Sequence, residues 1–141
     1  AETDNLINLK KKSAIKSGLK IIFCIGETLK ERRQKKTNQI LKKQIEKGLK
    51  SIKNKSKIII AYEPVWSIGT GVIPKEADLN KTISFIKSRF VKKYPKILYG
   101  GSVNTNNADI LKKIASIDGF LIGGASQNPK KFIDIIKKTI N

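Results

Sequence analysis

The sequence contains no histidine and only one cysteine, so it lacks the side chains on which most protein metal sites and every disulfide depend. Zinc is held mainly by cysteine and histidine, which excludes a zinc site in practice, and we expect neither a metal nor a cofactor. Cys24 lies inside the apolar run at residues 21–25 and has no cysteine partner. We expect it to be a small buried side chain in a protein of the reducing cytosol.

Acidic residues, arginines and aromatic residues are all scarce. Eleven Asp and Glu stand against 30 Lys and Arg, which gives a net charge of +19, and only Arg32, Arg33 and Arg89 are arginines. Such a charge first suggests nucleic acid as a partner. Recognition of bases, however, favours arginine side chains and aromatic platforms. A basic nucleic-acid-binding module therefore stays an alternative, while a solvated lysine-rich surface is favoured and no nucleic-acid partner is expected.

Long hydrophobic runs are also missing. No apolar run approaches the roughly 20 residues that cross a bilayer, and the amino end has no signal-peptide pattern, so we expect a cytoplasmic protein that does not bind membranes. A chain of 141 residues is long enough to bury one core. No linker or low-complexity tract divides it, and we expect residues 1–141 to form a single structural unit.

Short apolar runs recur along the chain, and each is followed by a segment with apolar residues at helical spacing. The runs predict strands at residues 19–25, 58–63, 97–99 and 120–122. Helices are predicted from Thr3 or Asp4 to Gly18, as one long helix capped by Thr28, from the segment after residue 74 to about residue 94, around residues 110–114, and from Pro129 onward. The last helix is expected to turn four apolar side chains inward: Phe132, Ile133, Ile136 and Ile140.

Four successive β-then-α units indicate an α/β fold with parallel strands and right-handed crossovers. A doubly wound sheet and part of a barrel both satisfy this pattern. In either fold, ligands bind at the carboxyl ends of the strands. The unusual residues of this sequence all lie at those ends: Glu27, Glu63, Gly100, Gly101, Ser102, Gly123 and Gly124.

Glu63 ends the β-branched run at residues 58–61, and Pro64 keeps it extended because the residue before proline avoids the helical region. The bulky residues 65–66 and then Gly69 and Gly71 follow, and the free backbone of these glycines would let the segment move over a ligand. Taken alone, an acid and two glycines describe an exposed strand end and an ordinary turn. The full string of residues favours a catalytic acid beside a lid.

A glycine pair follows each of two consecutive strands, at Gly100 and Gly101 and at Gly123 and Gly124. Backbone N–H groups without a neighbouring Cβ can approach an anion closely, and a following helix adds partial positive charge. Each pair alone is more typical of a tight turn. Their occurrence on consecutive strands predicts a phosphate site like the one after the last two strands of many (β/α)8 barrels.

The string AYEPVW at residues 61–66, followed by IGTG at 68–71, closely resembles the catalytic strand and lid of the triosephosphate isomerases. The strings CIGE (24–27), YGGSV (99–103) and GFLIGGAS (119–126) occur in the order found in that family. The resemblance implies the C-terminal half of a (β/α)8 TIM barrel, strands five to eight with their helices. Because a complete barrel takes about 250 residues and this sequence begins at Ala1 without any methionine, we expect an amino-terminal truncation.

The resemblance also implies a role for each matching residue. Glu63 would be the catalytic base, and the substrate phosphate would be bound by Gly69, Ser102, Gly123 and Gly124. Tyr99 would hold the closed lid, and Glu27 would support the hinge of the lid near Trp66. Ser67 and Gln127 stand where the family usually has alanine and leucine.

The implied reaction interconverts dihydroxyacetone phosphate and D-glyceraldehyde 3-phosphate through an enediolate, in a homodimer. The family also uses a lysine and a histidine that would lie before Ala1, so we expect the 141 residues alone to be inactive. Half a barrel would also leave two unpaired sheet edges that favour association. A sugar-phosphate epimerase or another phosphate-binding barrel enzyme is the alternative, since it shares the glycine pairs but not the string at residues 62–66.

Overall fold

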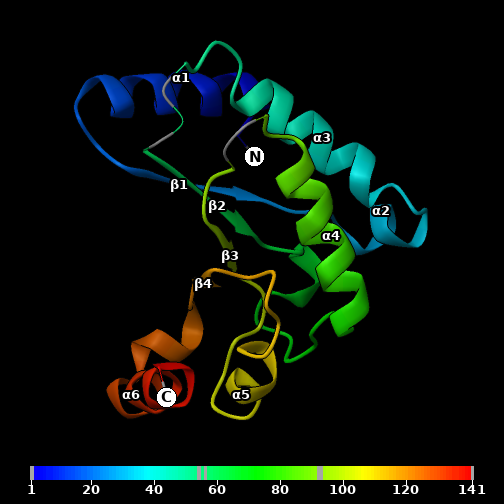
Figure 1. Ribbon diagram of the computed structural model, residues 1–141, viewed down its shortest axis with the longest axis vertical. Coiled ribbons are helices and arrows are strands. Elements are labelled where there is room, and N and C mark those ends of the chain that lie inside the picture. Colours follow the sequence, from blue (N-terminus) through cyan, green and yellow to red (C-terminus); the bar gives the residue numbers. More distant parts are fainter. Residues whose placement is uncertain (1, 54, 56, 92–93, 141) are drawn as a thin grey trace.

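The computed structural model describes residues 2–53, 55, 57–91 and 94–140. Within these residues the strands form one parallel sheet in the order β1-β2-β3-β4 (Figure 1), with β1 Ile21–Ile25, β2 Ile58–Tyr62, β3 Ile97–Tyr99 and β4 Gly119–Phe120. The helices are α1 Asp4–Lys16, α2 Leu29–Arg33, α3 Thr37–Gly48, α4 Glu76–Ser88, α5 Ala108–Leu111 and α6 Pro129–Ile140, with short 3-10 turns η1 Val65–Ser67 and η2 Gly124–Gln127. The predicted α/β class and the parallel strand order are confirmed.

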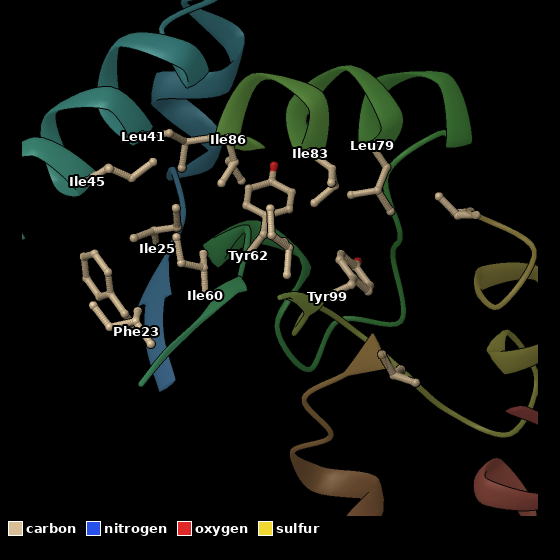
Figure 2. Packing of buried hydrophobic residues seen from close by; sticks show 14 of the residues in the cluster. Phe23, Ile25, Leu41, Ile45, Ile60, Tyr62, Leu79, Ile83, Ile86 and Tyr99 are labelled. Carbon is tan, nitrogen blue, oxygen red and sulfur yellow. The ribbon is translucent and has the colours of Figure 1, made fainter. Parts of the chain in front are cut away.

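The hydrophobic core lies between the sheet and the helices packed on one side of it. Figure 1 shows α3 and α4 along the same side of β1 and β2. In Figure 2, Leu41 of α3 and Ile83 and Ile86 of α4 point towards Ile60 and Tyr62 of the sheet, and all five of these side chains are fully buried. Burying an aliphatic side chain of this size contributes about 1.5–3 kcal/mol, so this layer holds the carboxyl ends of β1 and β2 in place.

The other face of the sheet is open at β1, where burial alternates along the strand. Phe23 and Ile25 are buried against the helices, whereas Ile22 and Cys24 are exposed. The expectation of a buried Cys24 is therefore wrong. Side chains alternate between the faces of a strand, and this parity places the thiol on the face that the helices do not cover.

The segment after β1 forms two helices where the sequence predicted one. Thr28 does cap a helix, but the short α2: its hydroxyl accepts from the Glu31 N–H at 3.3 Å, and its own N–H donates to the Glu31 carboxylate at 2.8 Å. Lys35 then adopts φ +57°, a left-handed conformation that no helix can continue through. The longer α3 begins two residues later.

Several other boundaries also differ from the predictions. The strand β1 begins at Ile21 and not at residue 19, β2 ends one residue before Glu63, and β4 is Gly119–Phe120 and not residues 120–122. Helix α4 ends at Ser88, well before the predicted end near residue 94, and residues 92–93 of that prediction lie outside the described residues. Helix α5 stops at Leu111, and Ile110 on it is exposed.

Helix α6 turns a different side chain inward from those predicted. Ile133 and Ile140 are exposed, Phe132 and Ile136 are half-buried, and the fully buried residue is Ile135. The apolar residues of α6 form one broad stripe, and the edge of that stripe at Ile135 packs most deeply while the opposite edge, at Ile133 and Ile140, is exposed. Among the described residues, no helix combines the length and apolar character that a bilayer span requires.

Candidate active site

The backbone of Glu63 is fixed between the ends of β1 and β3. Its N–H donates to the Ile25 carbonyl at 2.8 Å, which extends the ladder one residue beyond β2. A Cβ at Gly26 would collide with the Glu63 carbonyl oxygen, so only glycine fits beside it. Gln44 on α3 holds the Gly26 peptide, accepting from its N–H and donating to its carbonyl, both at 3.0 Å. The position of Glu63 along the sheet edge is thereby set from the β1 side, and on the β3 side the Gly100 N–H donates to the carbonyl of the preceding residue, Tyr62, at 2.8 Å.

The side chain of Glu63 lies directly over Gly100, the first residue after β3. A Cβ at Gly100 would stand 2.6 Å from Cγ and 2.8 Å from Oε1 of Glu63. Glycine at this position therefore leaves the space that the half-buried Glu63 side chain occupies. The sequence strings around residues 63 and 100 meet here in space.

Cys24 lies close enough to Glu63 for the two groups to interact electrostatically. The thiol reaches solvent, yet the protein atoms that surround it, and next the negative charge of Glu63, raise the pKa of Cys24 to about 12. The thiol is therefore protonated at neutral pH. It is no nucleophile in this arrangement.

Glu27 is a fully buried carboxylate at the carboxyl end of β1. It accepts from the Tyr62 hydroxyl at 3.1 and 3.2 Å and from the Trp66 indole N–H at 3.1 Å, and Arg32 lies 3.5 Å away. Arg32 also stacks on the Trp66 ring at 4.7 Å and donates to Asp78 at 3.1 Å. A charge buried this deeply requires such partners. The structure thus brings Glu27 and Trp66 together at the start of the glycine-containing segment.

The charge of Glu27 also acts on the tyrosine that donates to it. Burial, and after it the neighbouring Glu27 carboxylate, raises the pKa of Tyr62 far above its ordinary value. Tyr62 consequently stays protonated at neutral pH and donates its hydroxyl proton to Glu27.

We call residues 65–73, which follow Glu63 and Pro64, the lid. Gly69 and Gly71 have φ of +70° and +79°, a left-handed conformation that favours glycine. The Gly71 N–H donates to the Ser102 hydroxyl at 3.1 Å, so the lid reaches the turn after β3. Gly69 itself is exposed, and the space beside its Cα is open.

Tyr99, at the end of β3, is buried below the lid. Its hydroxyl lies 2.9 Å from the Ser67 hydroxyl, and burial raises its pKa. Gly123 and Gly124 follow the neighbouring strand β4, where both are exposed and the Gly123 carbonyl accepts from the Ser126 N–H at 2.9 Å. The structure therefore gathers Glu63, Tyr99 and Ser102 with the lid, while the second glycine pair lies one strand further along the same edge.

Three residues that the sequence did not single out contribute to this site: Gly26, Arg32 and Gln44. Ser67, which the sequence marked only as a departure from the family's usual alanine, contributes as well. Gly26 lies in the string CIGE at residues 24–27, which matches the family, so the sequence did contain a signal for it. The others have polar partners that are distant in sequence, so no local spacing could have revealed them. Among the described residues, no group of three or more potential ligands could hold a metal ion.

The sequence profile of the family described as "Triosephosphate isomerase" matches residues 1–139. The chain belongs to the triosephosphate isomerase family. It is 45% identical over 142 residues to the triosephosphate isomerase of Thermodesulfovibrio yellowstonii, a match that covers 96% of this chain and 58% of that protein. Proteins of the same name from Mycoplasma mobile and Candida albicans are 46% and 42% identical, and cover 96% and 99% of this chain.

The chain spans 56–58% of the length of these triosephosphate isomerase relatives. Membership of the triosephosphate isomerase family accounts for the observed fold, since the parallel four-stranded sheet with its helices is consistent with half of the family's barrel. It also places the chain in a family of isomerases, which stands against the alternative of a basic nucleic-acid-binding module.

Proposed function

We propose that this chain provides the catalytic base of an isomerase that interconverts dihydroxyacetone phosphate and D-glyceraldehyde 3-phosphate. The observation that carries the proposal is the position of the Glu63 side chain, which lies over Gly100 at the carboxyl edge of the sheet and beside the lid. The relatives named triosephosphate isomerase support the choice of reaction.

In the proposed mechanism, Glu63 takes a proton from the carbon next to the substrate carbonyl. The resulting enediolate receives the proton back on the adjacent carbon while the hydroxyl proton passes from one substrate oxygen to the other, so the enzyme ends as it began. A carboxylate is a stronger base when water is excluded from it, and a lid that covers the site would exclude water. The nearby Cys24 thiol stays protonated and adds no negative charge beside the base.

The substrate phosphate would be held by Gly69, by Ser102 and by the pair Gly123 and Gly124. Backbone N–H groups at glycines can approach phosphate oxygens closely, and β3 and β4 are neighbours in the sheet. The phosphate would then bridge the lid and the two strand ends. Holding it in line with the carbon skeleton would protect the enediolate from losing it.

Tyr99 and the Glu27–Trp66 pair would support the lid from below. We further propose a cytoplasmic protein that acts as a homodimer and needs no metal or cofactor. The 141 residues include no histidine to polarise the substrate carbonyl. Loss of one preorganised donor typically costs about 100- to 1,000-fold in rate, so the chain alone should show no measurable turnover.

The proposal is tested with a joined protein, in which the amino-terminal two-fifths (about 42%) of the Thermodesulfovibrio relative precedes residue 1 of this chain. A coupled assay with glyceraldehyde 3-phosphate should detect isomerisation by the joined protein and not by the chain alone. Glu63→Asp withdraws the carboxylate by about 1 Å, which should lower kcat/KM about 100-fold, and Glu63→Gln should lower it further.

Glu46→Gln is the matched control, because Glu46 is an exposed acid on α3 whose ion pair, within the described part of the chain, is with Lys42 on the same helix surface. It should leave kcat/KM unchanged. Turnover by Glu63→Gln within twofold of the unsubstituted joined protein would show that Glu63 is not the base.

A further inference from the structure

We propose that Ser67 is a positioning residue, whose buried hydroxyl holds both ends of the lid to β3 and to the turn after it. The inference rests on the proposed function in one respect, that the lid covers a phosphorylated substrate. The bonding itself is independent of the reaction.

Ser67 is fully buried, although it lies in a segment whose other residues are largely exposed. Its Oγ lies 2.6 Å from the Val72 carbonyl oxygen, 2.9 Å from the Tyr99 hydroxyl and 3.2 Å from the Ser102 backbone nitrogen. Val72 is at the far end of the lid, Tyr99 ends β3, and Ser102 is in the turn that follows. One oxygen atom therefore contacts three separate segments.

The donors and acceptors among these groups can be assigned only one way. A carbonyl oxygen can only accept, so the single Ser67 proton goes to Val72. The Ser102 N–H can only donate, so it occupies one Ser67 lone pair. The Tyr99 hydroxyl must then donate to the second lone pair, and burial keeps that hydroxyl protonated by raising its pKa. The hydrogen-bonding capacity of Ser67 is fully used.

Ser102 is hydrogen-bonded to the lid through both its backbone N–H and its side-chain hydroxyl. Its N–H donates to Ser67, and its hydroxyl accepts from the Gly71 N–H at 3.1 Å. Gly101 leaves room for this arrangement, since a Cβ there would stand 2.6 Å from the Ser67 hydroxyl oxygen. The turn proposed to bind phosphate and the lid are thus joined twice, and Ser67 supplies one of the two bonds.

Removing the Ser67 hydroxyl would leave the Tyr99 hydroxyl, the Ser102 N–H and the Val72 carbonyl without this partner. An unsatisfied buried polar group is costly, and the lid can relieve the cost by opening to water. We expect Ser67→Ala to shift the lid about tenfold towards open conformations, which corresponds to about 1.4 kcal/mol.

The first measurement uses the 141-residue chain and its single tryptophan, Trp66, which lies in the lid beside Ser67. Ser67→Ala should raise the acrylamide quenching constant of Trp66 at least twofold. Ser88→Ala is the matched control, because the Ser88 hydroxyl also donates to a backbone carbonyl, that of Phe85 at 2.7 Å, but at the exposed end of α4. It should leave the quenching constant unchanged.

The second measurement uses the joined protein and counts inorganic phosphate released per isomerisation. In an open site the enediolate can break its carbon–oxygen bond to phosphate, the electron pair leaving with the phosphate, to give methylglyoxal without any oxidant or reductant. Ser67→Ala should raise this ratio about tenfold, while a substitution that only lowered stability would leave the ratio of the folded enzyme unchanged.

If Ser67→Ala does not fold, Tyr99→Phe removes one of the three bonds and should raise quenching in the same direction. An unsubstituted joined protein without isomerase activity would refute the proposed function and not the role of Ser67, which quenching still decides. Quenching of Trp66 unchanged in the folded variant, or a phosphate ratio within twofold in an active joined protein, would overturn the inference.

Discussion

Gly100→Ala is a one-carbon test of how the proposed base is positioned. The added Cβ would stand 2.6 Å from Cγ and 2.8 Å from Oε1 of Glu63. Carbon atoms in contact prefer separations of about 3.5–4.0 Å, so the Glu63 side chain must move by about 1 Å. The backbone has no reason to move, because the clash involves a flexible side chain and φ at Gly100 is not left-handed.

A displacement of about 1 Å at a reacting group can cost about 100-fold in rate. We therefore expect kcat/KM of the joined protein to fall about 100-fold with Gly100→Ala, with most of the loss in kcat. The measurement is the coupled isomerase assay at several substrate concentrations. Urea unfolding of the same variant should show a loss of about 1–3 kcal/mol, as expected for overpacking.

A double-mutant cycle separates the clash from other effects. In a Glu63→Ala background, the Cγ and Oε1 atoms that meet the new Cβ are gone, so Gly100→Ala should no longer destabilise the chain. If Gly100→Ala alone keeps kcat/KM within twofold, or destabilises equally in both backgrounds, then Glu63 is not positioned by the space above Gly100.

Two further predictions concern buried charges. Lys11 on α1 is buried with its Nζ 2.9 Å from the centre of the Phe23 ring, and burial, partly opposed by Asp4, lowers its pKa from 10.5 to about 8. Below pH 8 the charged lysine therefore lowers the free energy of unfolding by about 2 kcal/mol, a value from which the cation–π attraction to the Phe23 ring has been deducted. This loss of stability disappears as the pH rises towards 10.5, above which the lysine is neutral in both states. Lys11→Met should therefore be more stable than the parent in urea at pH 7, and it should lose this advantage by pH 10. The exposed control Lys12→Met should show no such gain in stability at pH 7. Equal stability of Lys11→Met and the parent at pH 7 would contradict this reasoning. Glu27→Gln should destabilise the chain by about 3 kcal/mol and shift Trp66 emission to the red, because it removes the charge that Arg32 faces, and unchanged emission would argue against Glu27 as the support of the lid.

Sequence reasoning reached the parts of the site that short strings encode. Three such parts are the strand before Glu63, the lid with its glycines, and Gly100 at the end of β3. Each is a short run of residues with strong local preferences, and the structure places all three at one sheet edge. The pairing of Glu27 with Trp66 came from the family resemblance. Both residues lie in recognised strings, although 39 positions separate them.

What the sequence did not reveal depends on tertiary neighbours. Cys24 lies in a run without polar residues, so alternation could not tell which face would be covered. Lys35 adopts a left-handed conformation that its residue type does not favour, which divided the predicted long helix. Gln44 and Ser67 are ordinary polar residues whose importance comes from partners on other elements.

The lid is attached to the sheet through one pair of residues on two neighbouring strands. Tyr62 and Tyr99 are paired residues of β2 and β3, and their hydroxyls reach Glu27 and Ser67, which hold the first residues of the lid. The backbones from which the two tyrosines project are consequently separated by the spacing of adjacent parallel strands, about 4.8 Å. A slip of one strand by a single residue would turn its tyrosine to the opposite face and release that attachment. Attachment of the lid therefore requires the correct register between β2 and β3.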